Sequence, residues 1–212
     1  NFPLFPINSV STFLKLFTAI NRVYMKQWSS LFSMFVQLIK TLPSLLTGDM
    51  LRNMLMLIGK RNDFILSFDY YSVGAYRLGD QIIKIKLSPQ SVDKNTGRKQ
   101  KIKDSLTNYL QTHDFTADVM IQICYDLKDQ PVNKLNVEWK NSPFIKIGEV
   151  RINKDSLLDS RNCTNELLSF NPFESKMFFQ PVGKIQKLRD EAYKISLQTR
   201  RKINKLLHGK NS

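Results

Sequence analysis

The sequence of 212 residues lacks the marks of several common protein classes. It contains two cysteines, Cys124 and Cys163, which are too few for a disulfide-stabilised scaffold and have no zinc-site spacing. We expect both to be thiols in a reducing compartment, which favours a cytoplasmic location. Glycine and proline number eight each, and this scarcity excludes collagen-like repeats and flexible linkers rich in these residues.

Long hydrophobic runs are also missing from the sequence. Apolar residues are dense from Phe13 to Ile58, but the longest uncharged stretch there, Gln27 to Ile39, is shorter than the roughly 20 apolar residues of a membrane-spanning helix. No signal-peptide pattern precedes this region. The hydrophobic content of 42% is sufficient for a core, so we expect one domain spanning residues 1–212. Because the chain begins at Asn1 rather than methionine, we expect that domain to be N-terminally incomplete.

The net charge of +14 is concentrated in two segments. Residues 84–103 carry a local charge of +6 and residues 176–212 one of +8, so the rest of the chain is neutral. Aromatic residues are not interleaved with these lysines as they are in base-stacking sites, and we therefore expect no nucleic-acid partner. Contact with an anionic membrane surface is an alternative that such patches leave open.

Hydrophobic periodicity predicts an α+β fold. Apolar residues recur at helical spacing in residues 10–60, after an extended segment at residues 1–9. Beyond Asp63 the pattern changes to alternation, which indicates strands of a mostly antiparallel sheet with one buried face. The predicted strands are residues 82–87, 119–125 and 144–152, and a polar loop at residues 91–103 is expected to carry the first basic segment.

A long amphipathic helix is predicted from Gly183 to Leu207. When it is projected at about 100° per residue, most charges lie opposite an apolar face that we expect to be buried. Arg189, Tyr193 and Arg200 fall on the rim of that face. The apolar face consists of Ile185, Leu188, Ala192, Ile195, Thr199, Ile203, Leu206 and Leu207.

Arg189 and Tyr193 are one helical turn apart, so the guanidinium can reach the phenolic oxygen. A cation in that position favours the ionised phenol, which is a hard anionic ligand for ferric iron. Arginines at the edge of a core also require an anionic partner, because a buried charge must be paired. Spacing leaves a second interpretation open, in which Tyr193 is an amphipathic core-edge residue and both arginines pair with carboxylates of the strands.

Arg189-x-x-x-Tyr193 followed by Arg200 resembles the proximal-side signature of the catalases and the smaller catalase-like haem proteins. Further segments are similar to that family and occur in the family's order along the chain. These are Asn1-Phe2-Pro3-Leu4-Phe5, Tyr71-Ser72, Tyr76-Arg77-x-Gly79-Asp80, Glu138-Trp139, Ser142-Pro143-Phe144, Ser169-Phe170-Asn171-Pro172 and Pro181-Val182-Gly183.

The resemblance implies that the chain is the C-terminal, proximal part of a catalase-like antiparallel β-barrel with flanking helices. It implies haem b as the cofactor, with Tyr193 as the axial iron ligand and Arg189 stabilising its phenolate. Arg200 and Phe170 are implied as further haem-binding residues. The implied activity is that of an oxidoreductase that decomposes hydrogen peroxide or organic hydroperoxides such as those of lipids. A homo-oligomer is a further expectation.

The chain also departs from the family pattern. The catalase histidine that acts on peroxide precedes the point where this chain starts, so we expect no catalytic residue within it. His113 and His208 lie in a polar loop and a charged tail instead. After the Phe-Asn-Pro motif, other residues replace the tryptophan, histidine and His-Arg pair common in relatives, which implies an altered proximal side or a lost haem. These residues are Phe173, Glu174, Phe178 and Phe179.

A function of a different class is left open by the same sequence. The chain would then be a non-enzymatic basic scaffold, a degenerate catalase-like domain that binds an anionic membrane surface or partner through residues 84–103 and 176–212. Residue patterns alone do not decide between this interpretation and the haem enzyme.

Overall fold

The computed structural model describes residues 63–97, 100–156 and 168–208, together with scattered helical positions between Ser11 and Leu55. Apart from those positions, the helices expected in residues 10–60 lie outside the described residues, as do the extended segment at residues 1–9 and the motif Asn1-Phe2-Pro3-Leu4-Phe5. Within the described part, no helix has the length and apolar character needed to cross a bilayer.

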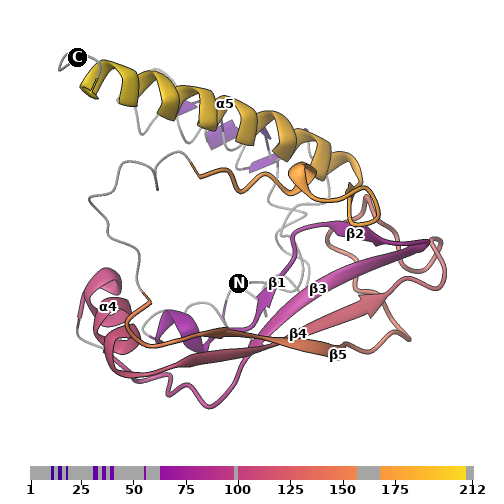
Figure 1. The fold of residues 1–212 in the computed structure, drawn as a ribbon. Coiled ribbons are helices and arrows are strands. Elements are labelled where there is room, and N and C mark those ends of the chain that lie inside the picture. The colour runs from indigo at the N-terminus through magenta and orange to yellow at the C-terminus, as the bar shows by residue number, and fades with distance from the viewer. Residues whose placement is uncertain are drawn as a thin grey trace.

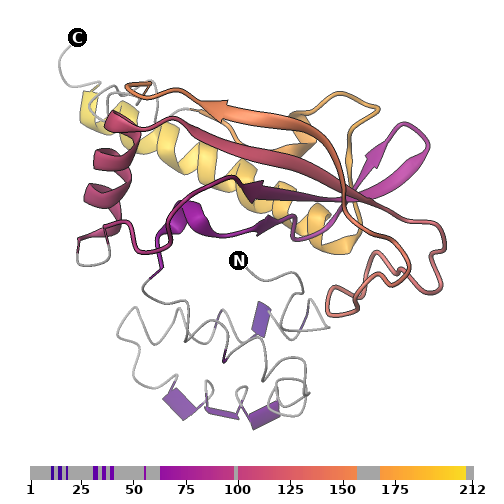
Figure 2. The same ribbon diagram turned by 90° about the horizontal axis from the view of Figure 1, so that it is seen from below.

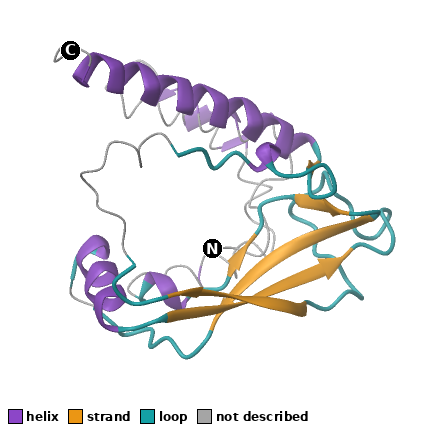
Figure 3. Cartoon of the chain, viewed as in Figure 1, coloured by secondary structure: helices purple, strands orange, loops and turns teal. Residues whose placement is uncertain are grey.

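A six-stranded antiparallel sheet forms the body of the described chain, with helices on its flanks (Figures 1 and 3). Its strand order is β5-β4-β3-β2-β6, and β1 pairs with the far end of β3. The α+β class is therefore confirmed, but over the described residues the expected barrel is an open sheet. The strands are β1 (Tyr70–Tyr71), β2 (Ala75–Leu78), β3 (Gln81–Pro89), β4 (Phe115–Ile123), β5 (Ile145–Ile152) and β6 (Pro181–Val182).

The two central long strands, β3 and β4, pair their apolar residues as predicted. Ile83 of β3 faces Ile123 of β4, and Ile85 faces Ile121, so their apolar side chains share one face of the sheet. A register shift between β4 and β5, beside Val119, breaks the strict alternation expected for the last strand. Ile83 and Ile121 are buried, whereas the side chains of β5 at the edge of the sheet are largely exposed.

Helix α4 (Ile102–Thr112) covers the start of β4 and was not anticipated from the sequence. Its Leu110 packs with Phe115 and Ala117 of β4 in the main hydrophobic cluster. The polar loop expected around His113 begins later than predicted, because Gln111 and Thr112 belong to α4. The His113 backbone N–H donates to Tyr109 O and so ends the helix. Leu106, Tyr109 and Leu110 of the helix are at helical spacing and pack in this cluster, which stabilises so short a helix.

The first basic segment, residues 84–103, is not the single basic loop that was expected. Lys84 and Lys86 lie on β3, and Lys86 forms an ion pair with Asp69 at 3.1 Å. The predicted turn at residues 95–97 is present, and Gly97 adopts a positive φ of 61° there. The described lysines of this segment are therefore divided between a strand face, a turn and the start of α4.

The long loop between β4 and β5 is fixed onto the sheet by buried amides. Gln122 of β4 donates from Nε2 to the carbonyl oxygens of Trp139, at 3.0 Å, and Ser142, at 2.7 Å. Trp139 is 2% exposed, and the Lys84 ammonium lies 4.4 Å from the centroid of its ring. Burial lowers the pKa of Lys84 to about 8. The motifs Glu138-Trp139 and Ser142-Pro143-Phe144 therefore have a structural role in this chain.

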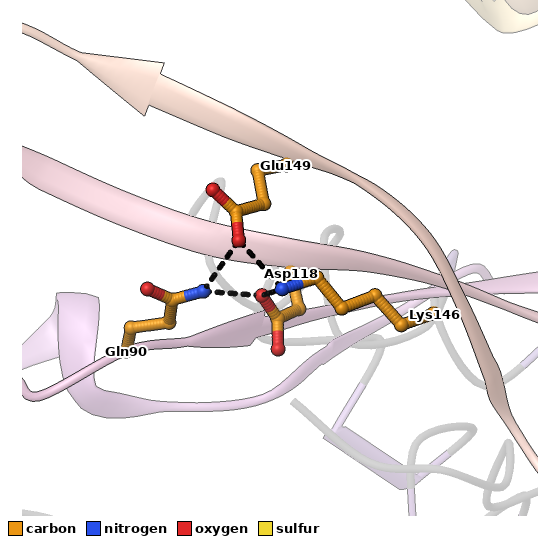
Figure 4. Close-up of polar contacts among 4 residues, drawn as sticks. All are labelled: Gln90, Asp118, Lys146 and Glu149. Atoms are coloured by element: carbon orange, nitrogen blue, oxygen red, sulfur yellow. Dashed lines mark hydrogen bonds and ion pairs between the residues drawn. The ribbon is translucent and has the colours of Figure 1, made fainter.

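A polar network on the same face ties β5 to its neighbours (Figure 4). The Lys146 ammonium of β5 contacts Asp118 of β4 at 2.8 Å and Glu149 at 2.5 Å, and the Gln90 amide, just after β3, donates to both carboxylates. Hydrogen bonds from Lys146 and Gln90 hold the pKa of Asp118 below its ordinary value. Since these groups are solvent-accessible, we expect the network to favour the observed register more than to add stability.

Candidate functional site

The predicted C-terminal helix is confirmed as α5 (Lys184–His208) and carries three of the four predicted site residues. The helix meets the sheet at its N-terminal end and extends away from the strands (Figures 1 and 2). Its apolar face is buried only where it meets the sheet: Ile185 is 6% exposed, whereas Ile195 is 61% and Leu206 70% exposed. The expectation of a fully buried apolar face is therefore wrong for the later part of the helix.

The start of α5 is defined by the motif Pro181-Val182-Gly183. Pro181 and Val182 form β6, which pairs with β2. Gly183 then turns the chain with a φ of +100°, and a Cβ there would lie 2.8 Å from Val132 Cγ1. The Asn133 Oδ1 accepts a hydrogen bond from Lys184 N at 2.8 Å and so satisfies one of the unpaired amides at the helix start. The β4–β5 loop and β2 together therefore place the first turn of α5.

Arg189 and Tyr193 are in direct contact, as their spacing predicts. Arg189 Nη2 donates to Tyr193 Oη at 3.0 Å, and its guanidinium carbon lies 5.5 Å from the centroid of the tyrosine ring. Arg189 Nη1 donates to Gln186 Oε1, also at 3.0 Å. Both side chains are half-buried. One guanidinium thus links the phenol oxygen to an amide in the preceding turn of the helix.

The expected anionic partner of Arg189 is not found among the described residues. Its partners there are the Gln186 amide oxygen and the Tyr193 phenol oxygen, and neither is a carboxylate. A guanidinium hydrogen bond stabilises negative charge on the oxygen that accepts it. The contact between Arg189 and Tyr193 therefore fits a phenol oxygen that bears negative charge when it binds a cation.

Gln186 was not singled out in the sequence, although it is central to this contact. It is fully buried, with 0% exposure, and its Nε2 donates to Ala75 O of β2 at 3.3 Å. The available signal was an uncharged polar residue three positions before Arg189, on the same side of the helix. That spacing occurs by chance in most amphipathic helices, so only the position of β2 reveals the role of Gln186.

Arg200 and Phe170 lie apart from this contact. Arg200 Nη1 donates to the backbone oxygen of Leu168 at 3.1 Å, which ties α5 to the segment that leads into η4 (Pro172–Glu174). Phe170 is 71% exposed. No hydrogen bond of the described residues connects either side chain to Tyr193, so their roles as haem-binding residues stay predictions from the resemblance.

The Phe-Asn-Pro motif connects η4 to α5. Asn171 Oδ1 accepts from Phe173 N at 3.1 Å, and its Nδ2 donates to Asp190 Oδ1 at 2.6 Å. Asp190 also accepts from Lys194 at 2.7 Å. Hydrogen bonds from Lys194 and Asn171 hold the pKa of Asp190 below its ordinary value. This motif therefore fixes the side of α5 next to Arg189 without contacting Tyr193.

The segment between η4 and β6 packs on β2. Phe179 stacks on Tyr76 with ring centroids 5.4 Å apart, and Gln180 O accepts from Arg77 N at 2.7 Å. Phe178 and Glu174 are exposed. Of the residues that differ from the family pattern, Phe179 therefore packs on β2, whereas Glu174 and Phe178 face solvent.

No described hydrogen bond or ring contact joins a histidine to Tyr193. His113 follows α4, where its ring stacks on Tyr109 at 4.9 Å, and His208 is the last residue of α5. Cys124 is a free thiol whose pKa burial raises, and Cys163 lies outside the described residues. In the described ranges no three His, Cys, Asp or Glu residues gather as a ligand set for a metal ion.

Comparison with known proteins identifies the fold. No family model matches the chain, and no curated protein matches it. The crystal structure of a fungal catalase is similar to it with a TM-score of 0.52 and 14% identity, over 64% of this chain and 31% of the catalase chain. A likeness at this identity concerns the fold alone, and the chain spans about a third of the catalase's length. Over the matched part, the chain therefore has a catalase-like fold.

Proposed function

We propose that this chain is the proximal part of a haem-dependent, catalase-like oxidoreductase in which Tyr193 is the protein ligand of the haem iron. The hydrogen bond from Arg189 to Tyr193 Oη carries the proposal, because it provides the charge that a phenolate ligand needs. The catalase-like fold of the matched residues supports it independently.

The residues around Tyr193 fit a haem iron in their chemistry. A phenol oxygen that accepts a hydrogen bond from a cation keeps a lone pair for a metal, and tyrosine is an established haem ligand. Tyr193 is half-buried, so part of its side chain is accessible to a cofactor on that side of the helix. Arg200, placed by Leu168 O, lies on the same side and would contribute positive charge there.

In the proposed reaction each residue of this chain has a separate task. Tyr193 Oη would hold the cofactor, and Arg189 donates a hydrogen bond to that oxygen, which stabilises negative charge on it. Bound haem would supply the iron at which a peroxide O–O bond is cleaved. The proton transfers between peroxide oxygens belong to a distal histidine that the proposal places outside this chain. Hydrogen peroxide and organic hydroperoxides are both substrates of the proposed class.

A hemin titration of the purified chain tests the proposal. We expect the wild-type chain to bind hemin at one equivalent with a Soret band, and resonance Raman spectra of the complex to contain tyrosinate modes. Tyr193→Phe removes the ligand oxygen and should remove both signals. The matched control is Tyr125→Phe, because the side chain of Tyr125 is exposed on the β4–β5 loop and the substitution deletes the same atom.

The proposal is supported if Tyr193→Phe loses the Soret band and the tyrosinate modes while Tyr125→Phe keeps both. Equal hemin binding by the wild-type chain and both variants would contradict it, as would a wild-type complex without tyrosinate modes. Circular dichroism and urea unfolding of each variant show whether a lost signal reflects a lost fold.

A second candidate function is supported by the later part of α5. Ile195 and Leu206 are exposed on one face of the helix. Lys202 borders that face, and Lys205 lies about a quarter turn further round the helix. An amphipathic helix with exposed apolar residues and an excess of basic side chains is suited to lie on an anionic lipid surface. We therefore propose that this part of α5 docks on membranes containing anionic phospholipid, independently of any haem.

Binding to vesicles of phosphatidylcholine and phosphatidylserine tests this second candidate. Each basic side chain near such a surface contributes about 1 kcal/mol to the free energy of binding. The double variant Lys202→Gln with Lys205→Gln should therefore weaken vesicle binding roughly 30-fold. The matched control is Lys101→Gln with Lys103→Gln, which removes the same charge from exposed positions at the start of α4. Equal losses in both double variants, or no binding at low salt, would exclude a docking role for α5.

A further inference from the structure

The contact between Arg189 and Tyr193 is continued by hydrogen bonds into the sheet. Ala75 O of β2 accepts from Gln186 Nε2 at 3.3 Å, Gln186 Oε1 accepts from Arg189 Nη1 at 3.0 Å, and Arg189 Nη2 donates to Tyr193 Oη at 3.0 Å. Four groups, from one strand and two turns of α5, are therefore joined in a single line. The phenol oxygen is at one end of this line and the backbone of a buried strand is at the other.

The strand determines which end of the Gln186 amide meets Arg189. A backbone carbonyl oxygen only accepts hydrogen bonds, so Ala75 O requires the amide nitrogen to face it. A reversed amide would set two oxygens against each other and would turn an NH₂ group toward a guanidinium that itself only donates. Because Gln186 is fully buried, water cannot compensate for either mismatch. The amide oxygen is therefore held toward Arg189.

Gly74 provides the space for this arrangement. A Cβ at position 74 would lie 2.9 Å from Gln186 Cγ and 3.0 Å from both Cδ and Nε2. Such distances are well inside van der Waals contact, and the neighbouring atoms belong to a side chain that is fully buried. The chain can place a glutamine amide against β2 because residue 74 has no side chain.

We propose that Gln186 is a positioning residue, which orients the Arg189 guanidinium so that its second NH₂ group donates to the Tyr193 oxygen. A free arginine side chain has many rotamers, and holding one NH₂ group fixes the plane of the guanidinium and thus the direction of the other. The sheet thereby sets the electrostatic environment of the phenol through two side chains. The consequence for haem binding rests on the proposed function, whereas the orientation of Arg189 does not.

The orientation can be tested in the haem-free chain. We expect the Arg189 guanidinium protons of the wild-type chain to exchange slowly with solvent in ¹⁵N NMR spectra, because both NH₂ groups are hydrogen-bonded. Gln186→Met keeps the size of the side chain and removes both hydrogen bonds, so it should speed this exchange at least 10-fold. The matched control is Gln130→Met, which removes another buried amide, at 3% exposure, from the β4–β5 loop. Unchanged exchange in Gln186→Met would overturn the proposal.

A double-mutant cycle in hemin affinity gives the second readout. Gln186→Met should weaken hemin binding on the order of 10-fold when Arg189 is present and should have no effect in an Arg189→Met background, because the glutamine acts through the arginine. Equal losses in both backgrounds would show a merely structural role and would refute the proposal. If the wild-type chain does not bind hemin, the proposed function fails and the exchange experiment alone decides the role of Gln186.

Discussion

Substitution of Gly183 by alanine tests whether α5 begins where the structure places it. Gly183 has a φ of +100°, and an added Cβ would lie 2.8 Å from Val132 Cγ1 and 3.2 Å from Asn133 Oδ1. The substitution therefore strains the backbone and presses on the two residues that hold the start of the helix. No rearrangement of a flexible side-chain end relieves this, since Val132 is β-branched and Asn133 is engaged with Lys184 N.

The expected cost of Gly183→Ala combines three effects. Holding a non-glycine residue at this φ costs roughly 1–3 kcal/mol. Displacement of the Asn133 side chain loses a helix cap worth about 1 kcal/mol, and overpacking against Val132 adds about 1 kcal/mol or more. We therefore expect the free energy of unfolding to fall by about 3–5 kcal/mol, which for a chain of this size corresponds to a loss of roughly 8–15 °C in Tm.

Two other glycines separate these effects in the same assay. At Gly79, φ is +59° but no atom lies within 4 Å of the added Cβ, so Gly79→Ala should cost only about 1 kcal/mol. At Gly148 the space is also open and φ is not positive, so Gly148→Ala should be neutral or slightly stabilising. Urea unfolding followed by circular dichroism measures all three. A cost at Gly183 no larger than that at Gly79 would refute the described packing at the start of α5.

Two further predictions concern the buried groups of the sheet. Gln122→Met should lower the free energy of unfolding by about 2–4 kcal/mol, because it leaves the carbonyl oxygens of Trp139 and Ser142 buried and unpaired. Gln90→Ala, at a solvent-accessible position, should change the free energy of unfolding by less than about 0.5 kcal/mol. Similar losses for the two variants in urea unfolding would contradict this prediction. Because burial lowers the pKa of Lys84 to about 8, the unfolded chain binds more protons than the folded one between pH 8 and the ordinary lysine pKa of about 10.5, so stability should rise with pH in that window. Lys84→Met should abolish that part of the rise, and an identical pH dependence in the variant would show that Lys84 is not its source.

The elements that the sequence predicted well are those with a strong periodic signal of their own. β3 and α5 begin and end within two residues of the predicted bounds, because alternation and helical spacing continue over their whole length. α4 was missed although Ile102, Leu106, Tyr109 and Leu110 recur at helical spacing, because the many polar residues between them resemble those of the preceding loop. The short strands β1, β2 and β6 exist through their partners, and no local pattern marks them.

The same distinction applies to the candidate site. The contact between Arg189 and Tyr193 follows from helix geometry and was predictable from a spacing of four residues. The role of Gln186 was not, because it depends on Ala75 and Gly74, which are more than 100 positions earlier in the chain. The direction of the apolar face was correctly derived, but its burial was not, since periodicity reports which residues share a face and not what covers it.

The proposed iron ligand and the proposed vesicle-binding residues lie at different distances from the sheet along one helix. The first turn of α5 is held by β6, by Asn133 and by the hydrogen bond from Gln186 to β2. Tyr193 lies two turns beyond Gln186, about 10 Å along the axis, so the sheet still determines its position. From Ile195 to Leu206 most side chains are exposed and are available to a different surface. Substitutions near Gln186 should therefore change hemin binding without changing vesicle binding, and those near Lys205 should do the reverse.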